Sequence, residues 1–431
     1  MTASRPEDKP PLRLLLIFST LSALYILSMF YRASNAVIAP DLIRELGLDA
    51  ETLGILGGAF FYSFALLQIP MGPMLDRIGP RRIVAFFSLI GGLGALLFAS
   101  GGSFITVFLG RILIGAGMAC MLMGAMKVFV LNFSSERFAT LVGFYLSIGT
   151  VGNVLSGSPL AYLASSIGWR RTFFIAGGVT ILLAFLVFWV LGGEKKKEGS
   201  VTSSSSEPAI GLLPSVRLVL GSLAFWQIGA VAFFRYGTFI SLQGLWLGPY
   251  LMDAKGYSPV QAGNMLVFLA IGIIVGAPVG GRLSDRTFKS PKAVALGGLS
   301  VYLLGLFLLL WVSKTLNPYW YGFLFFFMGF SSALAMMIFT HAKELFPITI
   351  SATVLAGVNF FSMVGGALLM TALGRVIQCF PRTNHTYPPE AYHLAFLICF
   401  LGMAAAVIFY AFAPKSKQSS GLGVQSSEFP N

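Results

Sequence analysis

The sequence predicts an all-α membrane protein with twelve transmembrane helices in two pseudo-symmetric six-helix bundles. Three observations support this fold class: the composition, a series of long apolar segments, and a pattern that recurs on both sides of a polar break. Of the 431 residues, 56% are hydrophobic and only 10% are charged. Soluble proteins have roughly 25% charged residues. We therefore expect most of the protein surface to face lipid.

Twelve apolar segments are long enough to cross a bilayer, which requires about 20 mostly apolar residues. They lie at residues 14–39, 53–73, 83–101, 104–131, 138–162, 172–192, 222–250, 260–282, 293–313, 319–342, 350–377 and 391–413. A charged and serine-rich stretch separates the sixth segment from the seventh. The predicted domains are an N-terminal bundle, a cytoplasmic linker, a C-terminal bundle and a cytoplasmic tail, at 1–192, 193–217, 218–413 and 414–431.

Lys and Arg residues are unevenly distributed between the two sets of loops. If the N-terminus is cytoplasmic, the inner loops hold most of them, including Arg77, Arg81, Arg82 and the lysines at 195–197. Positively charged loops stay in the cytoplasm, so we expect both termini there and attribute the net charge of +13 to this bias, not to nucleic acid. The expected location is the plasma membrane, such as a bacterial inner membrane. We expect a monomer whose partners are the lipid bilayer and a small anionic substrate.

A loop motif after the second segment carries a family resemblance. Residues 72–82 read Gly-Pro-Met-Leu-Asp-Arg-Ile-Gly-Pro-Arg-Arg, and residues 280–286 repeat part of it at the end of the eighth segment. The pattern Gly-x-x-x-Asp-Arg-x-Gly-x-Arg-Arg resembles the loop between helices 2 and 3 of the major facilitator superfamily. The spacing of Arg111, Gly115 and Gly117 resembles that superfamily's fourth-helix motif. The resemblance covers about residues 12–413 and implies the major facilitator fold.

A narrower likeness lies in the first segment. Arg32 stands eight residues before Pro40, a spacing similar to that in the first helix of the anion:cation symporter family, whose members carry sugar acids, phosphates and other organic anions. This chain has Tyr31 where that family usually has Asp, and it lacks the family's fourth-helix Glu near residues 116–118. Those two acids are associated with proton coupling in the family, so the resemblance does not extend to that route of coupling.

The predicted spans contain basic residues near their middles but no carboxylate. A charge in mid-bilayer costs roughly 2.5–3.5 kcal/mol on an inserted helix, so it is retained for a use. Arg32, Arg111, Lys127 and Arg235 lie within spans 1, 4, 4 and 7. By resemblance to the superfamily, helices 1, 4, 7 and 10 line a central cavity. The pattern therefore predicts an electropositive cavity for an anion, which an arginine can bind with two hydrogen bonds.

Helical periodicity and the resemblance together give the candidate residues. Tyr25, Ser28, Arg32 and Asn35 form one polar stripe, because residues three and four apart share a helix face. The predicted substrate-binding residues are Arg32, Arg235, Lys127, Tyr31, Asn35, Tyr25, Ser28, Thr238, Gln243, Trp246 and Asn359. The predicted gating residues are Asp76, Arg77, Gly79, Arg81, Arg82, Arg111, Asp285 and Arg286.

Two of these residues, Lys127 and Arg111, have alternative interpretations, and so has a further candidate, His341. Lys127 could reach the lipid headgroups instead of the cavity. Arg111 could be structural and bind backbone carbonyls. His341 could serve proton coupling, since its unperturbed pKa lies near physiological pH, or it could be an interfacial residue.

The predicted function is secondary active or facilitative transport of a small organic anion by alternating access. The first alternative is an exporter of drugs or other hydrophobic compounds, and the second is a ligand sensor that has the transporter fold but no flux. The sequence has no phosphate-binding Gly-x-x-x-x-Gly-Lys loop, no zinc-ligand spacing and no nucleophile–base constellation. We therefore expect neither enzymatic activity nor a cofactor.

Overall fold

The computed structural model describes residues 11–133, 135–192, 217–311, 318–347, 350–383 and 386–414. The predicted linker, apart from Arg217, and the predicted tail beyond Pro414 lie outside these residues. The helices are α1 (Pro11–Ala33), α2 (Asn35–Leu46), α3 (Ala50–Arg77), α4 (Pro80–Ser100), α5 (Phe104–Met118), α6 (Met121–Asn132), α7 (Ser135–Leu155), α8 (Ser158–Ile167), α9 (Trp169–Val190), α11 (Leu223–Ser241), η2 (Leu242–Trp246), α12 (Leu247–Asp253), α13 (Pro259–Arg282), η3 (Leu283–Thr287), α14 (Pro291–Trp311), α15 (Pro318–Leu334), α16 (Met337–Leu345), α17 (Ser351–Gln378) and α18 (Pro389–Ala411).

These helices form twelve membrane spans. Within the described residues, eleven helices or continuous helix pairs are long and apolar enough to cross a membrane. The bent pair α7 and α8, with an angle of 43° between its parts, supplies the twelfth. The described part of the chain is helical and contains no named strand. The predicted all-α membrane fold is therefore confirmed.

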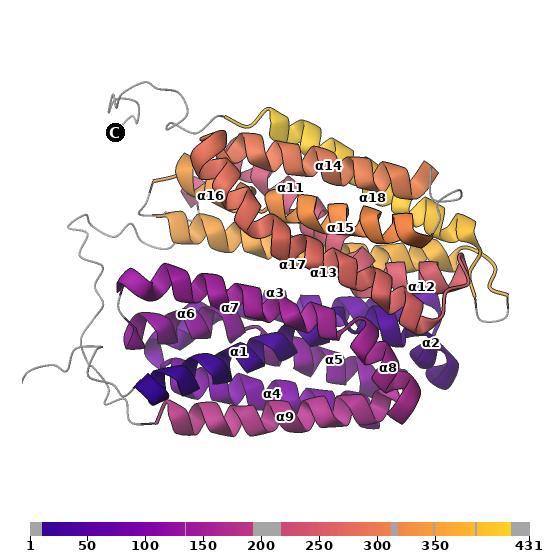
Figure 1. Cartoon of the computed structure of the whole chain (residues 1–431), viewed down its shortest axis with the longest axis horizontal. Coiled ribbons are helices and arrows are strands. Elements are labelled where there is room, and N and C mark those ends of the chain that lie inside the picture. The colour runs from indigo at the N-terminus through magenta and orange to yellow at the C-terminus, as the bar shows by residue number, and fades with distance from the viewer. Residues whose placement is uncertain are drawn as a thin grey trace, which may run out of the picture.

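Equivalent helices of the two halves have equivalent neighbours. In the N-terminal half α5 packs on α3 and α4, and α1 packs on α7; in the C-terminal half α15 packs on α13 and α14, and α11 packs on α17. Figure 1 shows the halves as two layers, indigo to magenta and orange to yellow. Because the same neighbour pattern recurs, the two halves are pseudo-symmetric copies of one bundle.

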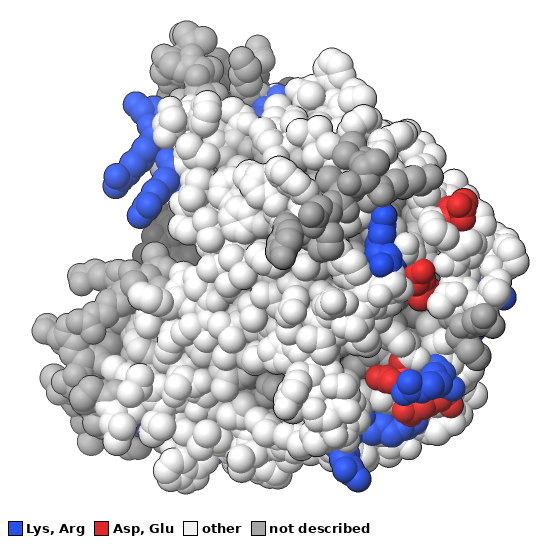
Figure 2. Space-filling model, turned by 45° about the vertical axis from the view of Figure 1, so that its right-hand side comes forward, with Lys and Arg blue, Asp and Glu red and all other residues white. Residues whose placement is uncertain are grey.

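The outer surface has the character of a membrane protein. Large apolar side chains such as Leu66, Ile69, Leu182 and Trp189 are exposed. Figure 2 shows a broad face between the two ends of the molecule on which Lys, Arg, Asp and Glu are absent. Exposed apolar surface of this extent is not found on soluble monomers, so this belt is where lipid contacts the protein.

Glycines allow backbone contact between helices of the N-terminal half. A Cβ atom at Gly115 of α5 would lie 2.2 Å from the carbonyl oxygen of Phe60 on α3. A Cβ atom at Gly117 would lie 2.2 Å from the amide nitrogen of Gly91 on α4. Small residues permit such close helix packing in membranes. This packing fixes α5, and therefore Arg111, against α3 and α4.

The halves are joined most tightly at one end. Figure 1 shows α2, α8 and α12 at the end opposite the start of α1 and the end of α18. We call the end with α2, α8 and α12 the distal end and the other the terminal end. At the distal end α2 packs on η2 and α12, and α8 packs on α13. At the terminal end α6 and α16 pack on helices of their own halves. The long pair α3 and α17 runs between these ends.

Candidate functional site

Five spans of the described residues are interrupted, which the sequence did not predict. The fifth span is the bent pair α7 and α8. The first span ends at the break between α1 and α2, the fourth breaks between α5 and α6, and the tenth breaks between α15 and α16, while the seventh contains the π-helical segment η2. These last four are the spans that the resemblance assigns to the cavity. Interrupted helices free backbone groups and are characteristic of transporter binding sites.

Side chains satisfy the carbonyl groups that the breaks release. The carbonyl oxygen of Tyr31 accepts hydrogen bonds from Arg111 Nη1 at 2.9 Å and from Ser34 Oγ at 3.1 Å. At the break in the fourth span, Gln68 Nε2 donates to the carbonyl of Ala119 at 2.8 Å. These bonds hold the broken backbone in place and fix the position of Arg32, which follows Tyr31.

Arg32 reaches across to the other half of the protein. Its Nη1 donates to the hydroxyl of Tyr236 on α11 at 2.7 Å. Its Cζ lies 4.9 Å from the ring centroid of Phe64 and 6.0 Å from that of Phe61. The residue is 9% exposed. The guanidinium group is therefore surrounded by aromatic rings, which attract cations through their faces.

Arg235 approaches the same tyrosine from within the C-terminal half. Its Cζ lies 5.8 Å from the ring centroid of Tyr236. Its Nη1 contacts the carbonyl oxygen and the hydroxyl of Ser332, near the break in the tenth span, both at 3.3 Å. Arg235 is 4% exposed. Tyr236 thus connects the two predicted binding arginines, one from each half.

Neither arginine has an acidic partner in the described part of the chain. The ion pairs among these residues join Arg44 to Asp41, Arg170 to Glu45 and Arg375 to Glu51, all at the distal end. The Nε atoms of Arg32 and Arg235 are buried and have no hydrogen-bond partner. Buried donors are almost always paired in folded proteins, so these atoms mark a place where a ligand can bind.

Other members of the predicted polar stripe are buried beside Arg32. Tyr25 stacks on Tyr145 of α7, with centroids 4.6 Å apart, and is close enough to Arg32 and Tyr236 to interact electrostatically. Ser28 and Asn35 are each 1% exposed, and the Ser28 hydroxyl and both side-chain polar atoms of Asn35 have no partner. The stripe therefore adds neutral hydrogen-bonding groups to the two cations.

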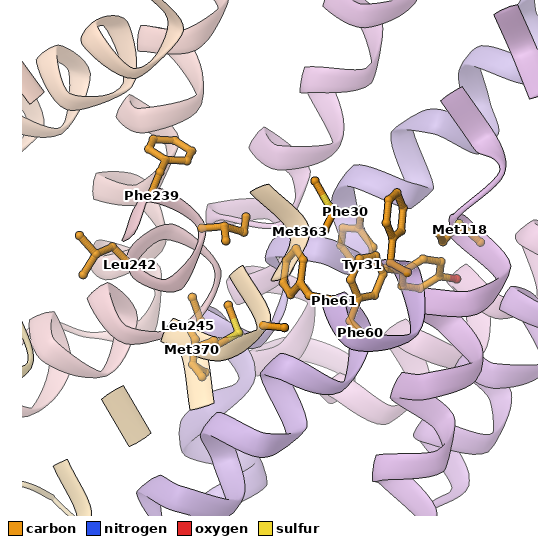
Figure 3. Close-up of a cluster of buried hydrophobic side chains, with 14 of the residues drawn as sticks. Phe30, Tyr31, Phe60, Phe61, Met118, Phe239, Leu242, Leu245, Met363 and Met370 are labelled. Carbon is orange, nitrogen blue, oxygen red and sulfur yellow. The ribbon is translucent and has the colours of Figure 1, made fainter. Parts of the chain in front are cut away.

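Several predicted binding residues have partners elsewhere. The Tyr31 hydroxyl lies 2.9 Å from Thr180 Oγ1 inside the N-terminal half, and Figure 3 shows its ring turned away from Phe61. Trp246 Nε1 donates to the Met370 carbonyl at 3.1 Å. The hydroxyls of Thr238 and Tyr302 are 3.3 Å apart.

The remaining predicted binding residues are placed as follows. Gln243 is buried within η2, and Asn359 is partly buried on α17. Lys127 lies on α6, six residues beyond the start of that helix. The substrate contacts of all these residues stay predictions.

His341 lies in a closed environment near the terminal end. It is 0% exposed, its Nδ1 lies 2.8 Å from the Tyr410 hydroxyl, and its Nε2 lies 3.0 Å from the Pro414 carbonyl. A carbonyl can only accept, so Nε2 carries the proton and Nδ1 accepts from Tyr410. This arrangement ties α16 to the end of α18 and suits a structural role.

The predicted gating residues lie around the ends of α3 and α13. Arg81 Nε donates to the Phe188 carbonyl of α9 at 2.8 Å. Gly79 has a φ of 92°, a conformation that other residues rarely adopt, whereas Arg77, Arg82 and Arg286 are exposed. The side chains of Asp76 and Asp285 lie outside the described part. Arg111 is fully buried and binds the Tyr31 carbonyl, as its structural interpretation predicts.

Tyr236, Gln68 and Ser332 were missed by the sequence analysis. Tyr236 follows Arg235 directly, and neighbouring residues on a helix point in different directions, so a search along one face leaves it out. Gln68 donates to a backbone carbonyl, and Ser332 lies beside a helix break and contacts Arg235. Each of them is a polar residue near the middle of a predicted span, and this position is the feature of the sequence that could have identified it.

The family model for the Major Facilitator Superfamily matches residues 21–370 and 250–426. Among similar proteins, a probable sulfoacetate transporter of Cupriavidus necator is 26% identical over 68% of this chain and 69% of its own. A probable galactarate/D-glucarate transporter of Escherichia coli is 24% identical over 64% of this chain and 67% of its own. A probable hexose phosphate transport protein of Chlamydia pneumoniae is 25% identical over 84% of each chain.

Solved structures share the fold. A bacterial homolog of the human lysosomal transporter Spinster, in an inward-facing and unoccupied conformation, has a TM-score of 0.76 at 20% identity, over 94% of this chain and 98% of its own. The D-xylose-proton symporter has a TM-score of 0.73 at 14% identity, over 94% and 99%. The family match, the two pseudo-symmetric bundles and the loop motif agree. The chain belongs to the major facilitator superfamily.

Proposed function

We propose that the protein carries a small organic anion across the membrane by alternating access and binds it with Arg32 and Arg235. The observation that carries this proposal is the pair of buried guanidinium groups that contact one tyrosine from opposite halves. Neither group forms an ion pair within the described residues. Removing a buried charge from water without a partner is costly, and an anionic substrate supplies that partner.

The comparisons support the same substrate class. The relatives are named for sulfoacetate, galactarate or D-glucarate, and hexose phosphate. These are small organic anions that carry two negative charges near neutral pH. Sulfoacetate has a sulfonate and a carboxylate, and the sugar diacids have two carboxylates. The hexose phosphate is largely doubly charged because the second pKa of a phosphate ester is about 6. A superfamily member with a basic site and relatives of this kind is best described as an organic anion carrier.

The site also suggests how binding is linked to movement. Arg32 belongs to the N-terminal half, whereas Tyr236 and Arg235 belong to the C-terminal half. An anion bound between the arginines would hold the halves together in an occluded state, from which either end could open. We further propose that the protein works as a monomer in the plasma membrane, with both termini in the cytoplasm.

Ligand-induced thermal stabilisation of the detergent-purified protein tests this function. A ligand at 100 times its Kd stabilises the folded state by about 2.7 kcal/mol. We expect an organic anion to raise the Tm, and we expect Arg32→Gln and Arg235→Gln each to reduce that shift strongly and to abolish uptake into proteoliposomes. The control is Arg44→Gln, because Arg44 has a side chain that is 70% exposed on α2.

Three outcomes would contradict the proposal. Stabilisation by lipophilic or cationic compounds alone would favour the drug-export alternative. Binding of an anion without flux in proteoliposomes would favour a ligand sensor. Wild-type uptake by both arginine variants would exclude the proposed binding site.

A further inference from the structure

We infer that the site selects substrates that carry two negative charges, and this inference rests on the proposed function. It adds a charge requirement to the substrate class. The basis is the number of fixed charges at Tyr236 and the absence, in the described residues around it, of any group that could balance them.

The two charges at this site are permanent. Guanidinium groups stay protonated in proteins, so Arg32 and Arg235 bring two positive charges to one tyrosine. Arg32 donates to the Tyr236 hydroxyl at 2.7 Å, and the Cζ of Arg235 lies 5.8 Å from the centre of the same ring. Both cations therefore lie within reach of one small molecule.

The groups that surround these cations are neutral. Arg32 faces the rings of Phe60, Phe61 and Phe64. Arg235 contacts Ser332 and lies close enough to Tyr302 to interact with it electrostatically. Aromatic faces and hydroxyl groups attract a cation but do not cancel its charge. The described protein contacts thus leave a net charge of two at the site.

Arg111 shares an aromatic neighbour with Arg32 but binds the backbone of the N-terminal half. Its Cζ lies 5.4 Å from the ring centroid of Phe60, and that of Arg32 lies 5.9 Å from the same centroid. Arg111 donates instead to the carbonyl of Tyr31 on the N-terminal side. It is fully buried in the N-terminal half, so it is part of the helix packing around the break in the first span.

The charge of the ligand then decides how well it is held. A monoanion would neutralise one guanidinium and leave the other as an unbalanced charge in a low-dielectric site. A dianion would neutralise both. Each arginine also has its own buried, unpaired Nε donor, so two anionic groups, or the several oxygens of one phosphate, can be bound at once.

Ligands that are matched in size but differ by one negative charge test this inference. The probes are sulfoacetate against sulfoacetamide and tartrate against its monoamide, with Kd measured by calorimetry on the purified full chain. Each amide keeps the size and shape of its parent but has one negative charge fewer. For at least one pair we expect the dianion to bind tenfold or more tightly than its partner.

Variants at the two arginines separate charge from folding. We expect Arg32→Gln and Arg235→Gln to reduce the tenfold preference to less than threefold, because one positive charge then remains for one negative charge. Arg235→Lys keeps the charge, so it should keep the preference even if affinity falls. Arg44→Gln, at the exposed distal end, should bind like the wild type.

The results distinguish the inference from the proposed function. Equal affinity of the wild type for a dianion and its monoanionic partner, with both lost in the arginine variants, overturns the charge requirement and keeps the anion site. A tenfold preference that survives in both Gln variants also overturns it. Absence of binding for every probe of either charge overturns both proposals.

Discussion

Tyr236 contacts both binding arginines, one from each half of the protein. Its hydroxyl accepts the hydrogen bond of Arg32 across the interface. We predict that Tyr236→Phe destabilises the ligand-free protein by about 1–3 kcal/mol, the usual cost of leaving a buried donor unpaired. A bound anion would take over that donor, so the anion-induced rise in Tm should be larger in the variant.

Thermal melts of the wild type and Tyr236→Phe, with and without the anion, check this prediction. Tyr62→Phe is the matched control, because Tyr62 is 41% exposed on the outer surface of α3. A smaller anion-induced shift in Tyr236→Phe than in the wild type would mean that the hydroxyl binds the anion directly and would contradict the exchange of partners.

Some site residues could be predicted from the sequence and others could not, because the sequence shows a charge within a span but not the direction of a side chain. Arg32 and Arg235 were found because a charge inside a span is costly and therefore conspicuous. Tyr31 was included for its place beside Arg32, but its hydroxyl lies near Thr180 inside the N-terminal half. Tyr236 was omitted although it contacts both arginines. The direction of a side chain depends on the break in its helix, and sequence periodicity assumes a regular helix.

The start of α3 is bound by the other half of the protein. The Ala50 amide, which the helix itself leaves unpaired, donates to Gln378 Oε1 and to the Tyr387 hydroxyl, both at 3.0 Å. Arg382 Nη1 donates to the Leu48 carbonyl at 3.0 Å, and Arg375 pairs with Glu51 at 2.9 Å. Burial raises the pKa of Tyr387 above its ordinary value, so its hydroxyl keeps its proton. These contacts close the distal end.

We predict that Gln378→Ala combined with Tyr387→Phe opens the distal end more often. Each lost hydrogen bond is worth about 0.5–1.5 kcal/mol, so the ratio of open to closed molecules should rise roughly tenfold. Pulsed electron spin resonance between labels at residues 44 and 390, on α2 and α18, measures this as a longer distance component.

The control for this experiment is Arg170→Gln. Arg170 pairs with Glu45 at 2.9 Å at the same end but within one half, so its loss should leave the distance distribution unchanged. An unchanged distribution in the double variant would show that apolar packing, not these polar contacts, closes the distal end.

The existence of the helices was predicted more easily than their interruptions. Apolar length alone gave all twelve spans, because the bilayer imposes a minimum on every one. The breaks after Ala33, Met118 and Leu334 and the π-helical turn at Leu242 are not marked by a common residue type. They depend on side chains of other helices, such as Gln68 and Arg111, that donate hydrogen bonds to the freed backbone carbonyls.

The fold of the whole molecule followed from composition, span count and one loop motif, but its closed end did not. Alternating access requires that one sequence support two arrangements of the same halves. A sequence therefore cannot show which end is closed. The contacts of α2 with α12 and of α8 with α13 identify the distal end as the closed one in this structure.

Locking that end tests whether the halves must separate there during transport. The Ser158 hydroxyl of α8 contacts Asn264 Oδ1 of α13, and both residues are accessible at the surface. We predict that a short bis-methanethiosulfonate crosslinker joining cysteines at positions 158 and 264 through two disulfide bonds abolishes uptake into proteoliposomes while anion binding in detergent persists. Cys379 is exposed and must first be replaced by Ser, whereas Cys120 and Cys399 are buried.

The crosslink restrains the halves without touching the arginine site, so it separates movement from binding. Reversal with a reducing agent should restore uptake, and each single-cysteine variant treated with the same reagent should transport normally. Uptake at the wild-type rate in the fully crosslinked double variant would mean that α8 and α13 stay together throughout the cycle. The substrate would then have to pass between the halves without the distal end opening at this contact, which is incompatible with a rocking movement of two rigid bundles.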